Sequence, residues 1–94
     1  MQGALQGIKV IELSQVLAAP FCGYQFSLLG AEVIKVEMPE APDCARNRGP
    51  IAELNKNGLG LTYQVQGANK KSLAIDLRTD AGRETLLRLV ESAD

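Results

Sequence analysis

Residues 8–37 place the strongest constraint on the fold, because they carry the pattern of a strand, a loop, a helix and a second strand. Residues 8–13 form a short apolar run rich in β-branched side chains, as expected of a strand covered on both faces. After a loop over residues 14–19, Pro20 suits the first turn of a helix and Gly30 its left-handed end. Residues 32–37 read as a second strand. Strands joined by a helix of this length are nearly always parallel, so the segment predicts a βαβ unit.

The expected helix after Pro20 has its large apolar side chains at the spacing of one helix face. Phe21, Tyr24 and Leu28 recur three and four residues apart, which is typical of a helix that packs on a sheet.

The second half of the chain predicts a long irregular region followed by a strand and a helix. Residues 38–71 are rich in glycine, proline and polar side chains, so we expect a loop-rich segment with a short helix or turn at 61–66. Residues 72–77 predict a third strand, and Thr79 suits the N-cap of a final helix. The expected fold class is therefore α/β: part of a Rossmann-like parallel sheet, ordered as βαβ, long loop and βα, in one domain over residues 1–94.

Size and charge exclude several classes of partner. A chain of 94 residues is enough for one small domain, and its net charge of −1 removes the usual reason to expect a nucleic acid or an anionic membrane. The sequence has no apolar run long enough to cross a bilayer, and residues 1–7 lack the pattern of a signal peptide. We expect a cytoplasmic protein.

The residue types needed for metal binding or hydrolysis are scarce. The chain has no histidine and only two cysteines, Cys22 and Cys44, which lie in no metal-binding spacing. We therefore expect two reduced thiols, with Cys22 buried on a helix face, and no metal site. Ser14 and Cys22 also lack the usual histidine base, so the residues present predict no catalytic group.

A βαβ unit also raises the possibility of a dinucleotide site. Such a site needs glycines in the first turn so that the backbone can approach a pyrophosphate, but residues 14–19 contain none. Pro20 removes a further N–H group. Only Glu37, at the end of the second strand, stands where a ribose-binding carboxylate would stand. A nicotinamide or flavin module remains an alternative to be tested.

The order and spacing of several segments resemble a known family. These segments are LQGIKVIELS at residues 5–14, APFC at 19–22, LGAEVIKVE at 29–37 and NKKSLAIDL at 69–77. Together they resemble the opening of the class III CoA-transferases, which include formyl-CoA and carnitine CoA-transferases and the related acyl-CoA racemases. The resemblance continues through Gly82 to residue 94 and is poorest over residues 40–66.

The resemblance implies a Rossmann-like domain that binds coenzyme A (CoA) or an acyl-CoA as a substrate, with no permanently bound cofactor. By position, the residues that would contact CoA are Leu17, Ala18, Ile75, Asp76, Leu77 and Arg78. Arg78 also suits this role physically, because its guanidinium follows a parallel strand and could hold a phosphate. The resemblance further implies a carboxylate acceptor as second substrate and a homodimeric enzyme.

Two departures from the family limit this expectation. Met38 occupies a position where members often carry an arginine that meets the adenine or a phosphate. The family's catalytic aspartate, which forms anhydride and thioester intermediates, would lie beyond residue 94. We therefore expect an amino-terminal fragment or truncated product of a CoA-transferase that is inactive alone. The alternatives are a fragment from the racemase branch and a non-catalytic module that requires a partner chain.

Overall fold

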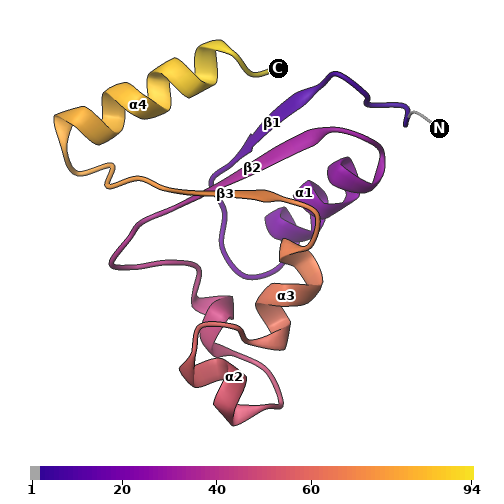
Figure 1. Cartoon of the computed structure of the whole chain (residues 1–94), viewed down its shortest axis with the longest axis vertical. Coiled ribbons are helices and arrows are strands. Elements are labelled where there is room, and N and C mark those ends of the chain that lie inside the picture. Colours follow the sequence, from indigo (N-terminus) through magenta and orange to yellow (C-terminus); the bar gives the residue numbers. More distant parts are fainter. Residues whose placement is uncertain (1–2) are drawn as a thin grey trace.

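The computed structural model describes residues 3–94, so the first two residues of the expected domain lie outside the described residues. The helices and strands, in chain order, are β1 (Lys9–Glu12), α1 (Ala18–Leu28), β2 (Glu32–Glu37), the 3₁₀ helix η1 (Cys44–Asn47), α2 (Ala52–Lys56), α3 (Leu61–Gly67), β3 (Lys71–Ala74) and α4 (Asp80–Glu91) (Figure 1). This order confirms the predicted α/β class.

The three strands form one parallel sheet in the order β1-β2-β3, with β2 in the centre. Lys9 pairs with Glu32 at the start of the first ladder, and Glu37 pairs with Ala74 at the end of the second. The central strand is the most buried element, with Val33 1% and Val36 4% exposed. The predicted βαβ unit is therefore confirmed, and its second strand has the predicted bounds.

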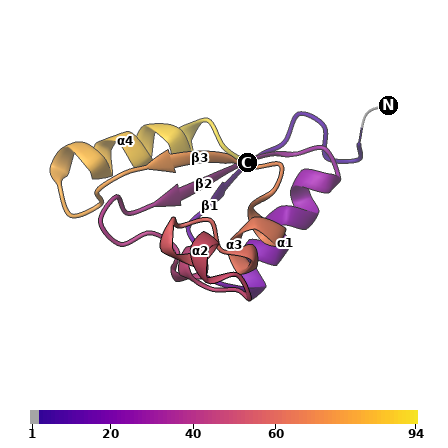
Figure 2. The ribbon, with the colours of Figure 1, turned by 60° about the horizontal axis from the view of Figure 1, so that its bottom comes forward.

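The sheet separates two layers of helices. Figure 2 shows α4 on one face, and α1, α2 and α3 on the other. In α4, Thr79 caps the first turn by accepting a hydrogen bond from the Gly82 N–H, as its position before Asp80 predicts. No residue of α4, which the structure describes in full, is buried, so this helix covers its face of the sheet loosely.

Helix α1 packs on the sheet through small residues, and two of the three large side chains expected on its packing face, Phe21 and Leu28, are exposed instead. Its buried residues are Pro20, Gly23 and Ser27, whereas Phe21 is 52% and Leu28 57% exposed. Gly30, with a φ of 103°, ends the helix in the left-handed conformation as expected. The inward face is small because buried ionic side chains, described below, lie between this helix and the sheet.

Two predictions from the second half of the chain need correction. The third strand ends at Ala74, not at residue 77, because its partner β2 ends at Glu37, the residue opposite Ala74. Residues 38–71 are also more ordered than a loop, since they contain η1, α2 and α3. The short helix expected at 61–66 is confirmed as α3.

Candidate functional site

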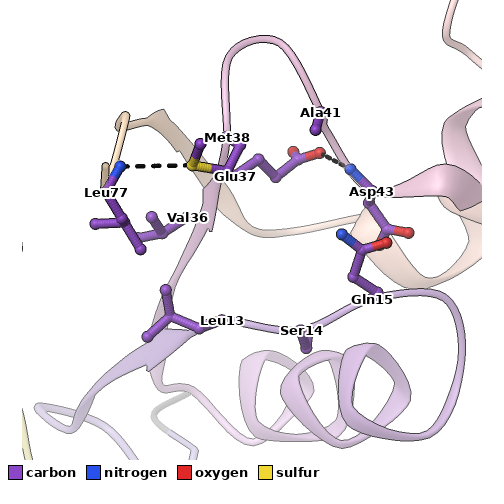
Figure 3. Close-up of a pocket in the computed structure, with 9 residues that line it drawn as sticks. All are labelled: Leu13, Ser14, Gln15, Val36, Glu37, Met38, Ala41, Asp43 and Leu77. Carbon is purple, nitrogen blue, oxygen red and sulfur yellow. Dashed lines mark hydrogen bonds between the residues drawn. The ribbon is translucent and has the colours of Figure 1, made fainter. Parts of the chain in front are cut away.

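The carboxyl ends of β1 and β2 and the loop after β3 enclose a pocket of about 260 Å³ (Figure 3). The residues that line it are Leu13, Ser14, Gln15, Val36, Glu37, Met38, Ala41, Asp43 and Leu77. Ligands of open α/β sheets bind at this edge of the sheet. The volume is below the roughly 300–1,000 Å³ of a typical small-molecule site, so the pocket suits one part of a larger ligand.

Met38 forms part of the pocket wall through an interaction that ties two strand ends together. Its Sδ atom accepts a hydrogen bond from the Leu77 N–H at 3.4 Å, as Figure 3 shows. Met38, where the sequence departs from the family it resembles, therefore fills space between β2 and the loop after β3. It contributes an apolar surface there and not a charge.

Beside the pocket, a buried lysine on β2 joins two carboxylates. Lys35, which is 1% exposed, places Nζ 3.0 Å from Glu12 Oε2 and 2.8 Å from Asp43 Oδ2. A second lysine, Lys70, places its Nζ 2.6 Å from Glu12 Oε1 and donates to the Pro20 carbonyl at 2.8 Å. We call Glu12, Lys35, Asp43 and Lys70 the ionic cluster. Its charges balance, as buried ions must.

Gly23 makes room for this cluster under helix α1. A Cβ atom at this position would lie 2.0 Å from Glu12 Oε1 and 3.3 Å from Lys70 Nζ. Only glycine allows the helix to approach the buried carboxylate so closely, which explains why the inward face of α1 is small.

A second ion pair holds Glu37, one of the residues that line the pocket. The Arg46 guanidinium donates to both oxygens of Glu37, from Nε at 2.9 Å and from Nη2 at 2.7 Å. Arg46 also lies over the Tyr63 ring, with Cζ 3.9 Å from its centroid, and donates to the Tyr63 hydroxyl at 2.8 Å. The Asp43 N–H donates to Glu37 Oε2 at 2.8 Å, which links this pair to the ionic cluster.

These contacts shift the pKa values of Lys35, Glu37 and Asp43 in the direction that favours their charged forms. Burial alone would raise the pKa of Asp43 and of Glu37, but hydrogen bonds from Lys35 and Arg46, respectively, outweigh it and hold both pKa values below their usual range. Burial would likewise lower the pKa of Lys35, yet its bonds to Asp43 and Glu12 leave that pKa raised. The carboxylates beside the pocket are therefore ionised and are poor proton donors at neutral pH.

The residues predicted to contact CoA lie in two places, at the start of α1 and directly after β3. Leu17 and Ala18 lie at the start of α1, directly after the residues Ser14 and Gln15 that line the pocket, and both are exposed. Ile75 is 5% exposed, and its N–H donates to the Glu37 carbonyl. Its side chain belongs to the core.

The remaining predicted residues follow β3, and only Leu77 lines the pocket. Asp76 pairs with Arg78, whose Nε lies 3.0 Å from Asp76 Oδ1, and the Arg78 side chain is 64% exposed. Arg78 also places Nη2 3.3 Å from Glu40 Oε2. Arg78 Nη2 also donates to Asp76 Oδ2 at 3.0 Å, so Asp76 holds the guanidinium by two bonds at the surface beside the pocket, and a phosphate would have to compete with this pair and with the exposed Glu40.

Sequence reasoning missed Lys35, Asp43, Arg46 and Lys70 as organisers of this region. One signal was available, since a lysine in the middle of the apolar strand EVIKVE must face a buried side of a central strand and needs a partner there. The partner Asp43 could not be found in this way, because it lies in a segment without periodicity.

The structure corrects the prediction for one of the two cysteines. Cys22 is exposed on α1, so the prediction that it is buried is wrong, while Cys22 and Cys44 are both free thiols. Within residues 3–94, no cluster of three potential metal ligands occurs. In the same range, no helix has the length and apolar character to span a membrane.

The structure defines an α/β domain with a parallel sheet and a pocket at the carboxyl edge of that sheet, and the turn after β1 lacks the glycines of the dinucleotide-binding fingerprint. The sequence profile described as CoA-transferase family III matches residues 5–94. The chain therefore belongs to CoA-transferase family III, which confirms the resemblance.

Individual relatives agree with this assignment. A succinyl-CoA:mesaconate CoA-transferase from Haloarcula hispanica is 41% identical over 98% of the chain, and a succinate–glutarate CoA-transferase from Agrobacterium fabrum is 42% identical over 96%. A crystal structure of a CAIB/BAIF family protein from Brucella suis superposes with a TM-score of 0.86 at 38% identity, covering 100% of this chain and 25% of that one. The chain spans about 23% of the length of these two curated relatives.

Proposed function

We propose that this chain is the amino-terminal, CoA-binding part of a CoA-transferase that moves CoA from an acyl-CoA to a carboxylic acid. The observation that carries the proposal is a pocket at the carboxyl edge of the sheet in a chain that belongs to CoA-transferase family III. The names of the relatives given above favour CoA transfer over the racemase branch, and they make succinyl-CoA the first donor to test.

The pocket fits one part of CoA. Leu13, Val36, Met38 and Leu77 give it apolar walls suited to an adenine ring or a pantetheine arm. The negative charges of Glu37 and Asp43 are neutralised by Arg46 and Lys35, so they do not repel an anionic ligand. On the surface next to Leu77, the exposed Arg78 supplies a guanidinium for a phosphate. In this proposal Leu17 and Ala18 contact the ligand from the start of α1.

The chemistry is proposed to reside in residues outside this chain. In the proposed mechanism an aspartate attacks the thioester to form an anhydride and release CoA thiolate, which attacks the aspartyl carbonyl to form an aspartyl thioester and release the donor carboxylate. The acceptor carboxylate attacks this thioester to form a second anhydride and release the thiolate, which attacks the acceptor's acyl carbonyl to give the new acyl-CoA and free the aspartate. No aspartate described above lies in a setting for this role, since Asp43 is held ionised in the ionic cluster and Asp76 pairs with Arg78. We therefore expect no turnover of an acyl-CoA by the 94 residues alone.

A calorimetric titration tests the proposal. We expect CoA to bind and NAD or FAD not to compete, and Arg78→Ala to weaken CoA binding about tenfold through the loss of a charge-assisted contact. The matched control is Arg88→Ala, which removes an equally charged side chain from the exposed surface of α4. Binding of NAD or FAD that CoA does not displace would instead support the dinucleotide alternative.

We also propose that the complete enzyme is a homodimer, as the resemblance implies. The large apolar side chains on the outer side of α1, Phe21 and Leu28, are 52% and 57% exposed and would be covered by a second copy. Analytical ultracentrifugation tests this: a dimer that Phe21→Glu dissociates supports it, and a stable monomer contradicts it.

A further inference from the structure

The turn between β1 and α1 contains a residue in an unfavourable backbone conformation. Val16 has a φ of 64°, in the left-handed region that β-branched residues rarely adopt. A residue stays in such a conformation only where its surroundings hold it there. Val16 directly follows the pocket residues Ser14 and Gln15 and precedes Leu17 and Ala18, so its conformation sets the course of the chain past the pocket.

Both backbone polar groups of Val16 are bound by the segment between β2 and β3. The Val16 N–H donates to Asp43 Oδ1 at 2.9 Å. On the other side, the buried side chain of Gln66, in the amide orientation that satisfies both its nitrogen and its oxygen, donates to the Val16 carbonyl at 2.7 Å. The segment that the sequence predicted to be loop-rich therefore holds this turn through Asp43, the residue before η1, and through Gln66 of α3.

Asp43 is itself fixed more firmly than a surface loop residue. It is 2% exposed, and its Oδ2 accepts from Lys35 Nζ at 2.8 Å. Its Oδ1 also accepts from the Ala45 N–H at 2.9 Å, and its own N–H donates to Glu37. Lys35 in addition donates to the Ser14 carbonyl at 3.2 Å, so the same lysine holds both the turn and the residue that binds it.

We propose that Asp43 is a positioning residue that holds Val16 in its left-handed conformation and thereby keeps the turn of residues 14–18 in the shape that receives CoA. The inference rests on the proposed CoA-binding function, because it assigns the turn to that ligand. Asp43 acts through Val16 and need not touch the ligand. A purely structural role is the competing explanation, since Asp43 also caps η1 and pairs with Lys35.

A double-mutant cycle with Val16→Gly separates these two roles. Glycine adopts a positive φ without strain, so a turn that carries the Val16→Gly substitution no longer needs to be held by Asp43. We expect Asp43→Ala to weaken CoA binding about tenfold when residue 16 is valine and less than about threefold when it is glycine. A structural role predicts an equal loss in both backgrounds, and that result would overturn the proposal.

The amide signals of residues 14–18 give a readout that does not depend on the ligand. In NMR spectra of the 94-residue chain, Asp43→Ala should shift these signals and speed hydrogen exchange at residue 16 when that residue is valine. The shifts should be small in the Val16→Gly background. If Asp43→Ala leaves these amide signals unchanged while residue 16 is valine, the positioning role is contradicted, whatever the result of the CoA titration.

A conservative variant covers the case in which Asp43→Ala does not fold. Combining Asp43→Asn with Lys35→Met removes both charges of the buried pair together and keeps an oxygen for the Val16 N–H, so this variant should retain the turn signals and bind CoA within about threefold of the original chain. Loss of both would overturn the proposal. If the unaltered chain fails to bind CoA while the amide signals follow the cycle, the proposed function fails and the positioning of Val16 stands.

Discussion

Replacement of Gly23 by alanine tests whether the ionic cluster shapes the packing of α1. In an exposed helix this substitution would stabilise the protein by about 1 kcal/mol, because alanine is the better helix former. Here the new Cβ would lie 2.0 Å from Glu12 Oε1, so the carboxylate must leave its place between Lys35 and Lys70. Breaking a buried pair of this kind costs about 3–5 kcal/mol.

The gain in helix propensity and the loss of the buried ion pair have opposite signs, so the measured change in the free energy of unfolding shows which is larger. We expect Gly23→Ala to lower the free energy of unfolding by about 2–4 kcal/mol, measured by urea denaturation followed by circular dichroism. In a chain of this size the melting temperature should fall by at least about 8 °C. Cys22→Ala is the matched control, because it changes an exposed residue of the same helix and should be close to neutral.

A second substitution identifies the cause of the loss. Glu12→Asp shortens the side chain by one methylene and withdraws the carboxylate from the new methyl group, so it should recover part of the stability of Gly23→Ala. A Gly23→Ala variant as stable as the original chain would refute the reasoning, because it would mean that the ionic cluster rearranges around the new methyl group without loss of stability.

Three further predictions concern the charged groups around the pocket. Lys35→Met should lower the free energy of unfolding by about 3–5 kcal/mol in urea denaturation, since Asp43 then loses its buried cation, whereas Lys56→Met on α2 should change little. Folding lowers the pKa values of Asp43 and Glu37, so their charged forms stabilise the protein above the usual carboxylate pKa near 4. The free energy of unfolding should therefore fall as the pH drops below about 4. A urea midpoint that stays constant from about pH 5 to pH 2.5 would contradict this prediction. Arg46→Lys should cost about 1–3 kcal/mol despite the retained charge, because lysine cannot make the two-pronged contact to Glu37 or cover the Tyr63 ring; equal stability would show that the charge alone matters.

The regular elements could be predicted from the sequence because their signals are local. The β-branched runs that form β1 and β2, Gly30 after α1 and Thr79 before α4 each depend on a few neighbouring residues. The inward face of α1 could not be predicted in this way. Its large residues suggested an apolar contact, but the sheet presents buried charges there, and only tertiary structure brings Lys70 beneath Gly23.

The candidate site shows the same limit. Its location at the carboxyl edge of the sheet follows from the βαβ pattern, and Leu77 was expected there. The third strand was predicted too long because its end depends on where its neighbour stops, at Glu37. Asp43 and Gln66 were missed because each contacts Val16 from at least 27 residues away along the chain. Contacts of this kind produce no periodic pattern of residues from which they could be predicted.

The ionic cluster also bears on how this domain can diverge in evolution. Loss of any one of Glu12, Lys35, Asp43 or Lys70 leaves an uncompensated charge in the interior, whereas replacement of a whole pair by apolar residues can be neutral. Substitutions at these positions should therefore be inherited in compensated sets. A relative in which Lys35 is apolar is expected to have lost the charge at position 43 or 12 as well, and its turn at position 16 is then expected to carry a residue, such as glycine, that holds a positive φ unaided.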